Sequence, residues 1–428
     1  MAAALATTTG LALWQAREAT QRFEQVRRLA ESLLFEIHDA VAPLPGSIAA
    51  SKLITARSLE YLDEIARNPR ASLDLQLNVV RGYLRLSELA GIEIGGRSMG
   101  DSSGGQVLAQ KALDVARRLA SAYPSSLEVQ AALADSLVNV ASAMHLRGLD
   151  KESLPGFDEA VQIASKLNAA QPGNPVSQER LAYALKQAAG PRFRLKMSEK
   201  GLQLAKQSLD LRHKIFDVLP NSPMALQKLS ESYLELASHY GFLRDFDRFP
   251  PYARESYRLT ELRYRRDPRN SRFPFSAAIA HMAVVAMHNK DYPDAIRLYL
   301  EMAKIRREIV DEDPRDVNAK VRYAAALDRV GNTYAYAGNY PEAIRSGEEA
   351  LQLLRKLHQE DPENSNTARE YLFAVGDLSK SYDLGKRLDR ACPLAREFLA
   401  NFNRAGRGTK VALNRHLDRN KTLLEKCP

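Results

Sequence analysis

The chain has 428 residues, of which 45% are hydrophobic and 26% are charged, an ordinary balance for a folded protein. Its net charge is +9, from 61 Lys and Arg against 52 Asp and Glu, and the basic residues are spread along the chain. No nucleic-acid-binding motif accompanies this modest excess, so it favours solvated helix ends, and no nucleic-acid partner is expected.

The first residues raise a question about membranes. Residues 1–14 are uncharged and mostly small or apolar, but a full span needs about 20 residues. Three interpretations remain open. The segment is the end of a truncated membrane helix, an apolar helix start, or a cleaved signal segment that lacks the usual positive charge. Residues 15–69 are expected to form an N-terminal helical segment.

Seven prolines then divide the chain at intervals of 55, 48, 48, 48, 46 and 48 residues. Proline ends the helix before it, and the Asn, Asp and Ser residues around these prolines cap the next helix. Each proline is therefore predicted to mark a helix end followed by a helix start, and the period predicts an array of stacked units. The prolines are Pro69, Pro124, Pro172, Pro220, Pro268, Pro314 and Pro362.

The segments between the prolines have a helical pattern. Residues 343–360 carry apolar or small side chains at the three-and-four spacing of an amphipathic helix, and no sustained strand-like alternation occurs. A second break lies near the middle of the clearest unit, at residues 338–341, where Pro341 suits the first position of a helix. Each unit is thus predicted to be a helix, a tight turn and a second helix.

The unit at 330–351 resembles the tetratricopeptide repeat (TPR). Residues 330–334 read Val-Gly-Asn-Thr-Tyr, which matches the Leu-Gly-x-x-Tyr of that motif. The resemblance implies an all-α, TPR-like α-solenoid, a right-handed superhelix of antiparallel helix pairs, with repeats over 70–390 and a capping hairpin over 391–428. The classical unit of about 34 residues is shorter than these units. The residues that the motif assigns to repeat packing are Gly331, Tyr334, Gly338, Tyr340, Ala343 and Ala350, with Tyr292 and Ala295 in the preceding unit.

A TPR groove commonly holds an extended peptide or a segment of a partner protein. By their position against the motif, four polar residues would face that groove: Asp328, Asn332, Asp377 and Lys380. The resemblance therefore implies a peptide or protein ligand bound at the first helices of successive units.

A second, narrower resemblance concerns the N-terminal part. Residues 22–39, the following Leu44-Pro45-Gly46-Ser47 and the Gly-rich stretch 91–105 are similar to the start of the repeat region in bacterial serine/threonine protein kinases with C-terminal TPRs. That family places a kinase domain and one membrane span before the repeats. The resemblance implies a membrane-associated protein with extracytoplasmic (periplasmic) repeats. An independent cytoplasmic TPR adaptor is the alternative.

Catalytic and metal-binding motifs give no support for an enzyme. The kinase Gly-rich loop and catalytic loop are missing, and Asp245-Phe246-Asp247 lacks the spacing of a phosphoryl-transfer site. His281 and His288 lie two turns apart without the Glu of a zinc pattern. We therefore expect a non-catalytic scaffold or sensor module with no cofactor and no metal.

The two cysteines, Cys392 and Cys427, both fall in the last predicted hairpin. A turn at residues 406–408 would bring the end of its second helix back toward the start of the first. Two interpretations remain open: a disulfide, which would suit an oxidising compartment, or two separate thiols, one of them buried.

Overall fold

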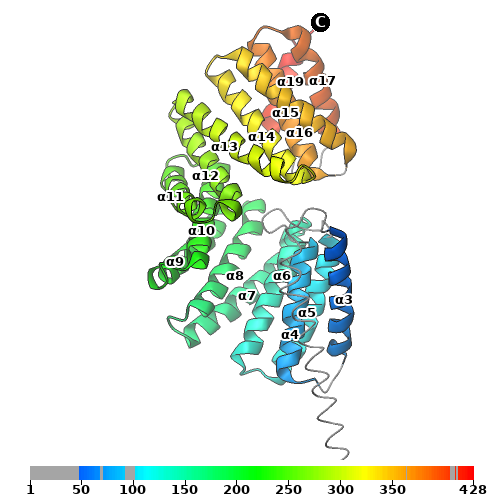
Figure 1. Ribbon diagram of the computed structural model, residues 1–428, viewed down its shortest axis with the longest axis vertical. Coiled ribbons are helices and arrows are strands. Elements are labelled where there is room, and N and C mark those ends of the chain that lie inside the picture. Colours follow the sequence, from blue (N-terminus) through cyan, green and yellow to red (C-terminus); the bar gives the residue numbers. More distant parts are fainter. Residues whose placement is uncertain (1–47, 68–70, 92–101, 363, 405–409, 411–412) are drawn as a thin grey trace, which may run out of the picture. The chain divides into compact units, whose positions relative to one another are not determined.

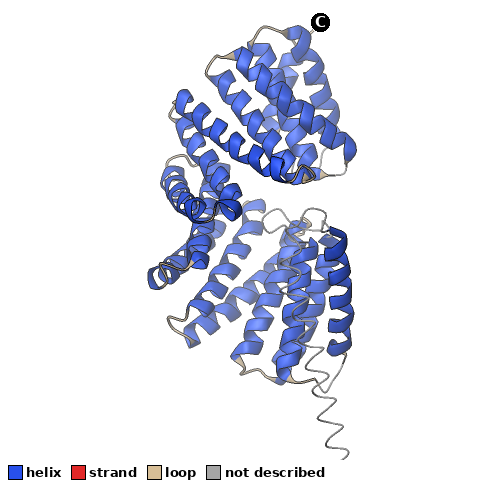
Figure 2. Ribbon diagram, in the orientation of Figure 1, coloured by secondary structure: helices blue, strands red, loops and turns tan. Residues whose placement is uncertain are grey.

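The computed structural model describes all residues except 1–47, 68–70, 92–101, 363, 405–409 and 411–412, and every regular element in the described ranges is an α-helix (Figures 1 and 2). The apolar segment 1–14 and most of the segment 15–69 lie outside the described residues, as does most of the Gly-rich stretch 91–105.

Within residues 48–194 and within residues 223–424, consecutive helices run back and forth and pack on one another, as a solenoid of helix pairs requires (Figure 1). The predicted all-α solenoid is confirmed. The helices are α3 Ile48–Ala66, α4 Leu73–Gly91, α5 Ser102–Ala122, α6 Leu127–Leu146, α7 Asp150–Ala170, α8 Pro175–Arg194, α9 Ser198–Val218, α10 Pro223–Leu243, α11 Phe249–Arg266, α12 Pro268–His288, α13 Tyr292–Glu312, α14 Val317–Tyr336, α15 Tyr340–Glu360, α16 Ser365–Leu384, α17 Leu388–Arg404 and α19 Asn414–Leu424.

The proline marks separate helices as predicted. Pro124, Pro172, Pro220, Pro314 and Pro362 each lie in the short linker between two helices. The helix that follows each linker is capped by a side-chain oxygen that accepts a hydrogen bond from a first-turn amide. These caps are Ser126, Asn174, Ser222, Asp316 and Asn364. Pro69 lies outside the described residues.

Pro268 differs from the other marks. It is itself the first residue of α12, and the cap is the preceding Asp267, whose carboxylate accepts from the Asn270 amide. Because α12 begins at the proline without a spacer, it starts earlier relative to its mark than the other helices do. This explains why the next proline follows after 46 residues instead of 48.

The turn inside each unit also repeats. One residue per turn has a positive φ, which glycine adopts freely and other residues adopt at a cost of about 1–2 kcal/mol. Gly338 is the residue that the sequence pattern singled out, with φ +80°. Asn339 then caps α15, so Pro341 is the second helical residue, not the first as predicted. The corresponding residues of the other turns are Gly148, Lys196, Arg244, Lys290 and Lys386.

Two compact units make up the chain, Met1–Ser208 and Leu209–Pro428, with the boundary inside α9. The first unit has a core built around residues such as Val80, Leu137 and Phe157. The second has one core around Leu354 and Phe398 and another around Ile279 and Met302. Each unit therefore has its own hydrophobic core.

Small residues allow close helix packing in the clearest unit. A Cβ added to Gly331 on α14 would lie 2.9 Å from the carbonyl oxygen of Ala343 on α15. Ala343, Ala350 and Ala295 are completely buried, while Tyr334 is partly buried against the neighbouring core. Tyr340 and Tyr292 are the first residues of α15 and α13. The close approach of Gly331 to Ala343 thus joins the two helices of one pair.

Candidate functional site

The compact unit Leu209–Pro428 contains several helix pairs, and the first helices of these pairs are α10, α12, α14 and α16. We call these four helices the A helices. Side chains at corresponding positions of the A helices form two rows. The two rows lie three residues apart along each helix, so both rows lie on the same helix face. We call this surface the A-helix face. One row is Glu235, His281, Arg329 and Asp377, and the other is Ser238, Val284, Asn332 and Lys380. Contacts across the rows join neighbouring helices, such as Ser238 Oγ to His281 Nε2 at 3.2 Å.

Two of the four residues predicted to face a groove contact each other. Lys380 Nζ on α16 donates a hydrogen bond to Asn332 Oδ1 on α14 at 3.0 Å. The same ammonium lies 3.4 Å from the ring centroid of Tyr336, a cation–π contact, and this tyrosine is 52% exposed. The structure therefore brings Asn332 and Lys380 together beside an exposed aromatic ring.

Asp328 lies one turn before Asn332 and is only 9% exposed. Within the described part of the chain, its carboxyl group makes no hydrogen bond and no ion pair. Burial, and then the negative charge of Asp377, raise its pKa well above the ordinary value. Asp328 is thus an almost buried acid whose hydrogen-bonding capacity the chain leaves unused.

Asp377 is engaged inside the chain. It is 7% exposed, and the C-terminal helix α19 reaches it through His416 Nε2 at 3.0 Å and Arg419 Nη2 at 3.3 Å from its Oδ1. Burial acts to raise the pKa of Asp377, but the hydrogen bond and charge of His416, with the charges of Arg419 and Lys380, outweigh it and lower the pKa. Position in the repeat placed Asp377 on an open groove, whereas α19 covers it.

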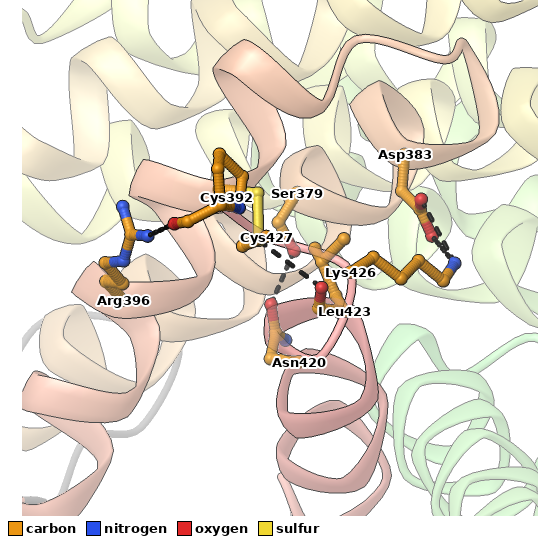
Figure 3. Close-up of a disulfide and its surroundings, with 9 residues drawn as sticks. Ser379, Asp383, Cys392, Arg396, Asn420, Leu423, Lys426 and Cys427 are labelled. Carbon is orange, nitrogen blue, oxygen red and sulfur yellow. Dashed lines mark hydrogen bonds and ion pairs between the residues drawn. A yellow bond between two sulfur atoms is a disulfide. The ribbon is translucent and has the colours of Figure 1, made fainter.

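The chain end is fastened around α19 (Figure 3). Cys392 near the start of α17 and Cys427 just after α19 form a disulfide, with their Cα atoms 5.9 Å apart. Ser379 Oγ on α16 donates to Asn420 Oδ1 at 2.6 Å, and Lys426 pairs with Asp383 at 3.1 Å. These contacts hold α19 in the place where the A helix of a further unit would lie.

Sequence reasoning missed Arg329. It occupies the row position of Asp377 exactly one 48-residue period earlier, so aligning the two units by that period would have found it. It also missed Arg306 on α13, a half-buried arginine on the second helix of the preceding unit, since the motif places only first-helix residues on this face.

Metal and membrane features are absent from the ranges that the structure covers. No group of three or more His, Cys, Asp or Glu residues there is arranged to hold a metal ion. No described helix combines the length and apolar character that crossing a membrane requires.

The chain is similar to known proteins in one repeat segment and in its fold. Residues 324–363 match the family model for the tetratricopeptide repeat, and no curated protein matches the chain. The apo form of RapI is 10% identical over 93% of this chain and 98% of its own, with a TM-score of 0.50. BtubC from P. vanneervenii is 17% identical over 59% and 91%, with a TM-score of 0.47. A Rap protein solved with competence and sporulation factor is 12% identical over 96% and 99%, with a TM-score of 0.44.

The repeat match and the likeness in fold agree with the helix pairs described above. The chain therefore has an α-solenoid fold and contains a segment, residues 324–363, that matches the tetratricopeptide repeat.

Proposed function

We propose that this chain is a non-catalytic protein-interaction module that binds an extended peptide or protein segment along the A-helix face. The observation that carries the proposal is Asp328, an almost buried carboxyl group without a hydrogen bond among the described residues. Burying such a group without a partner costs stability, so it is kept where it serves a ligand. Protonated, it donates to a peptide carbonyl; ionised, it accepts from a peptide amide.

The neighbouring residues supply complementary groups. Lys380 donates hydrogen bonds, the Asn332 amide both donates and accepts, and the exposed ring of Tyr336 offers apolar surface. A peptide backbone presents donors and acceptors alternately, so these three residues with Asp328 suit main-chain recognition. Asp377 contributes indirectly, by holding the position of α19 beside them.

The test is selection of random displayed peptides on the full chain, followed by affinity measurement on variants. Peptides enriched on the wild type should bind the Lys380→Ala and Asp328→Ala variants at least about tenfold more weakly, a difference of about 1.4 kcal/mol. Lys386→Ala, an exposed lysine in the turn after α16, is the matched control and should bind normally. Enriched peptides that bind all four proteins equally would refute this face as the binding site.

The setting of the module is a second part of the proposal. We assign it to the extracytoplasmic side of a membrane, next to a serine/threonine kinase as in the family it resembles, and the Cys392–Cys427 disulfide supports this because such bonds persist in oxidising compartments. Thiol alkylation followed by mass spectrometry of the native protein should find both cysteines linked, and the gene's upstream sequence should encode a span and a kinase domain. Two free thiols in the native protein would favour the cytoplasmic adaptor.

The non-catalytic part is tested separately. Highly purified chain incubated with Mg²⁺ and ATP should give no hydrolysis and no protein phosphorylation above a buffer control, because neither the phosphate loop nor the catalytic loop is present in the sequence. Phosphorylation that persists through purification would overturn the proposal that the chain is non-catalytic.

A further inference from the structure

The helix α19 has little stability of its own. It spans 11 residues, whereas the A helices span 20 or 21, and isolated helices shorter than about 12–15 residues are marginal in water. Each A helix follows a residue whose side chain caps the first turn, but Leu413, the residue before α19, provides no such cap. The position of α19 therefore depends on its contacts with α16 and α17.

Those contacts are largely polar. Two residues of α19 are buried, Asn420 and Leu423. Asn420 accepts a hydrogen bond from Ser379 and donates one to the His416 carbonyl oxygen at 2.7 Å. These groups bond to water when a helix detaches, so their hydrogen bonds add little net stability. The apolar contribution comes from Leu423 and two half-buried leucines of α19. The covalent bond to α17 is therefore the main restraint on this helix.

The disulfide lies where a reductant can reach it without unfolding a helix (Figure 3). Cys427 is half-buried and follows the last turn of α19, whereas Cys392 on α17 is 3% exposed. Lys426 precedes Cys427 in the chain, and Arg396, one turn after Cys392, donates to the carbonyl oxygen of Pro428 at 3.0 Å. Nearby positive charge favours the thiolate form of cysteine, which promotes thiol–disulfide exchange. The bond is thus placed for exchange at Cys427.

Release of α19 would uncover one end of the A-helix face. Arg419 donates to the Gly376 carbonyl oxygen, and both Arg419 and His416 contact the Asp377 carboxylate. A Cβ on Gly376 would lie 2.8 Å from His416 Cδ2, so the imidazole lies directly on the backbone of α16. Asp377 lies one turn before Lys380 on the A-helix face. Without α19, this face gains a carboxylate and a backbone carbonyl group that the closed chain conceals.

We propose that the Cys392–Cys427 disulfide is a redox-controlled lock on α19, and that its reduction by a protein dithiol releases α19 and uncovers Asp377. The proposal goes beyond the proposed peptide-binding function and does not depend on it. The oxidised chain is the closed form, with α19 docked on α16. The reduced chain is the open form, in which the A-helix layer ends at α16.

The exchange balances in two steps. A thiolate of the dithiol attacks Sγ of Cys427, the bond between the two cysteine sulfurs breaks, and Cys392 leaves as a thiolate that takes up a proton. The second thiol of the reductant then attacks the mixed disulfide and releases Cys427. Two electrons pass to the chain, which gains two thiols, while the dithiol is oxidised to a disulfide.

The experiment treats the oxidised full chain with an excess of reduced thioredoxin, a protein dithiol, under native conditions. Alkylation and mass spectrometry should show both cysteines free. Hydrogen exchange of the α19 amides should then become at least about tenfold faster, while that of α14 and α15 stays unchanged, because the release is local. The Cys392→Ser/Cys427→Ser double variant should exchange fast in α19 from the start and should not respond to thioredoxin.

A second readout follows the uncovered carboxylate itself. Labelling with a carbodiimide and glycine ethyl ester modifies accessible carboxylates, so the labelling of Asp377 should rise at least about threefold on reduction, since the 7% exposed side chain loses its cover. Asp361, an exposed acid in the linker after α15, is the internal control and should be labelled equally in both forms.

Three results would each overturn the proposal. The first is a disulfide that thioredoxin leaves intact in the folded chain, since the lock would then have no key among protein dithiols. The second is a fully reduced chain in which the exchange of α19 and the labelling of Asp377 do not change. The third is faster exchange in α14 and α15 by the same factor as in α19, which would mean that reduction opens the whole unit.

Discussion

The imidazole Nε2 of His416 lies 3.0 Å from Oδ1 of Asp377, and this contact joins the last helix to the A helix before it. Arg419 shares the same carboxylate oxygen, while the imidazole Nδ1 is buried without a hydrogen bond among the described groups. The contact closes the end of the A-helix layer.

Removal of this imidazole should destabilise the chain. His416→Ala leaves the buried Asp377 carboxylate with Arg419 alone, so unfolding in urea should show a loss of about 1–3 kcal/mol at neutral pH. Because the folded-state pKa of Asp377 is lowered below its ordinary 3.8, its ionised form stabilises the fold above that pH, and the contribution is lost as pH falls through the folded pKa. The difference from wild type should therefore narrow in acid. Arg415→Ala, at an exposed neighbour, should change little.

Asp328 should behave in the opposite way. Its folded-state pKa is raised well above 3.8, so the carboxylate costs stability at neutral pH, and this cost shrinks as pH falls and disappears below 3.8, where both the folded and unfolded states are protonated. Asp328→Asn should stabilise the chain by about 1 kcal/mol or more at pH 7, with a gain that shrinks in acid. Chemical unfolding at several pH values measures this, and Asp418→Asn, an exposed acid on α19, is the control. If Asp328→Asn leaves the free energy of unfolding at pH 7 unchanged or lowers it, the carboxylate of Asp328 is not an unpaired, destabilising group.

Gly331 should tolerate no side chain. A Cβ there would lie 2.9 Å from the Ala343 carbonyl oxygen and 3.1 Å from the Gly347 amide nitrogen, both backbone atoms that cannot swing aside. Gly331→Leu should therefore cost about 1–3 kcal/mol through overpacking. Gln352→Leu, which adds apolar volume at an exposed position of α15, controls for the side chain itself. Equal urea midpoints for the two variants would refute the close approach of α14 and α15.

The disulfide should be the strongest single support of the C-terminal end. It closes a separation of 35 residues, for which the chain-entropy model gives about 3–4 kcal/mol. Reductant should lower the urea midpoint of the wild type and leave a Cys392→Ser/Cys427→Ser double variant unaffected. Peptides linked through the two cysteines should appear in a non-reducing digest. Insensitivity of the oxidised wild type to reductant would count against that contribution.

Position relative to the motif found Asn332 and Lys380, which meet across two A helices because 48 residues separate them as the period requires. It did not find Arg306, because this residue lies on the second helix of a unit and its Nη1 donates to the backbone carbonyl oxygen of Arg322 on the neighbouring helix. Gly347, where the motif usually has an aromatic residue, leaves room that Leu378 from the next unit occupies, with a would-be Cβ contact of 2.9 Å.

The sequence by itself determined the helices, their ends and their repetition, because proline, caps and amphipathic spacing act within a few residues of one another. The sequence also predicted the close packing at Gly331, because the motif that identifies this position is local in the chain. Only the tertiary structure decided that α19 covers Asp377 and that Asp328 remains without a partner. Those relationships depend on burial and charge among residues about 40 to 90 positions apart, which no local pattern encodes.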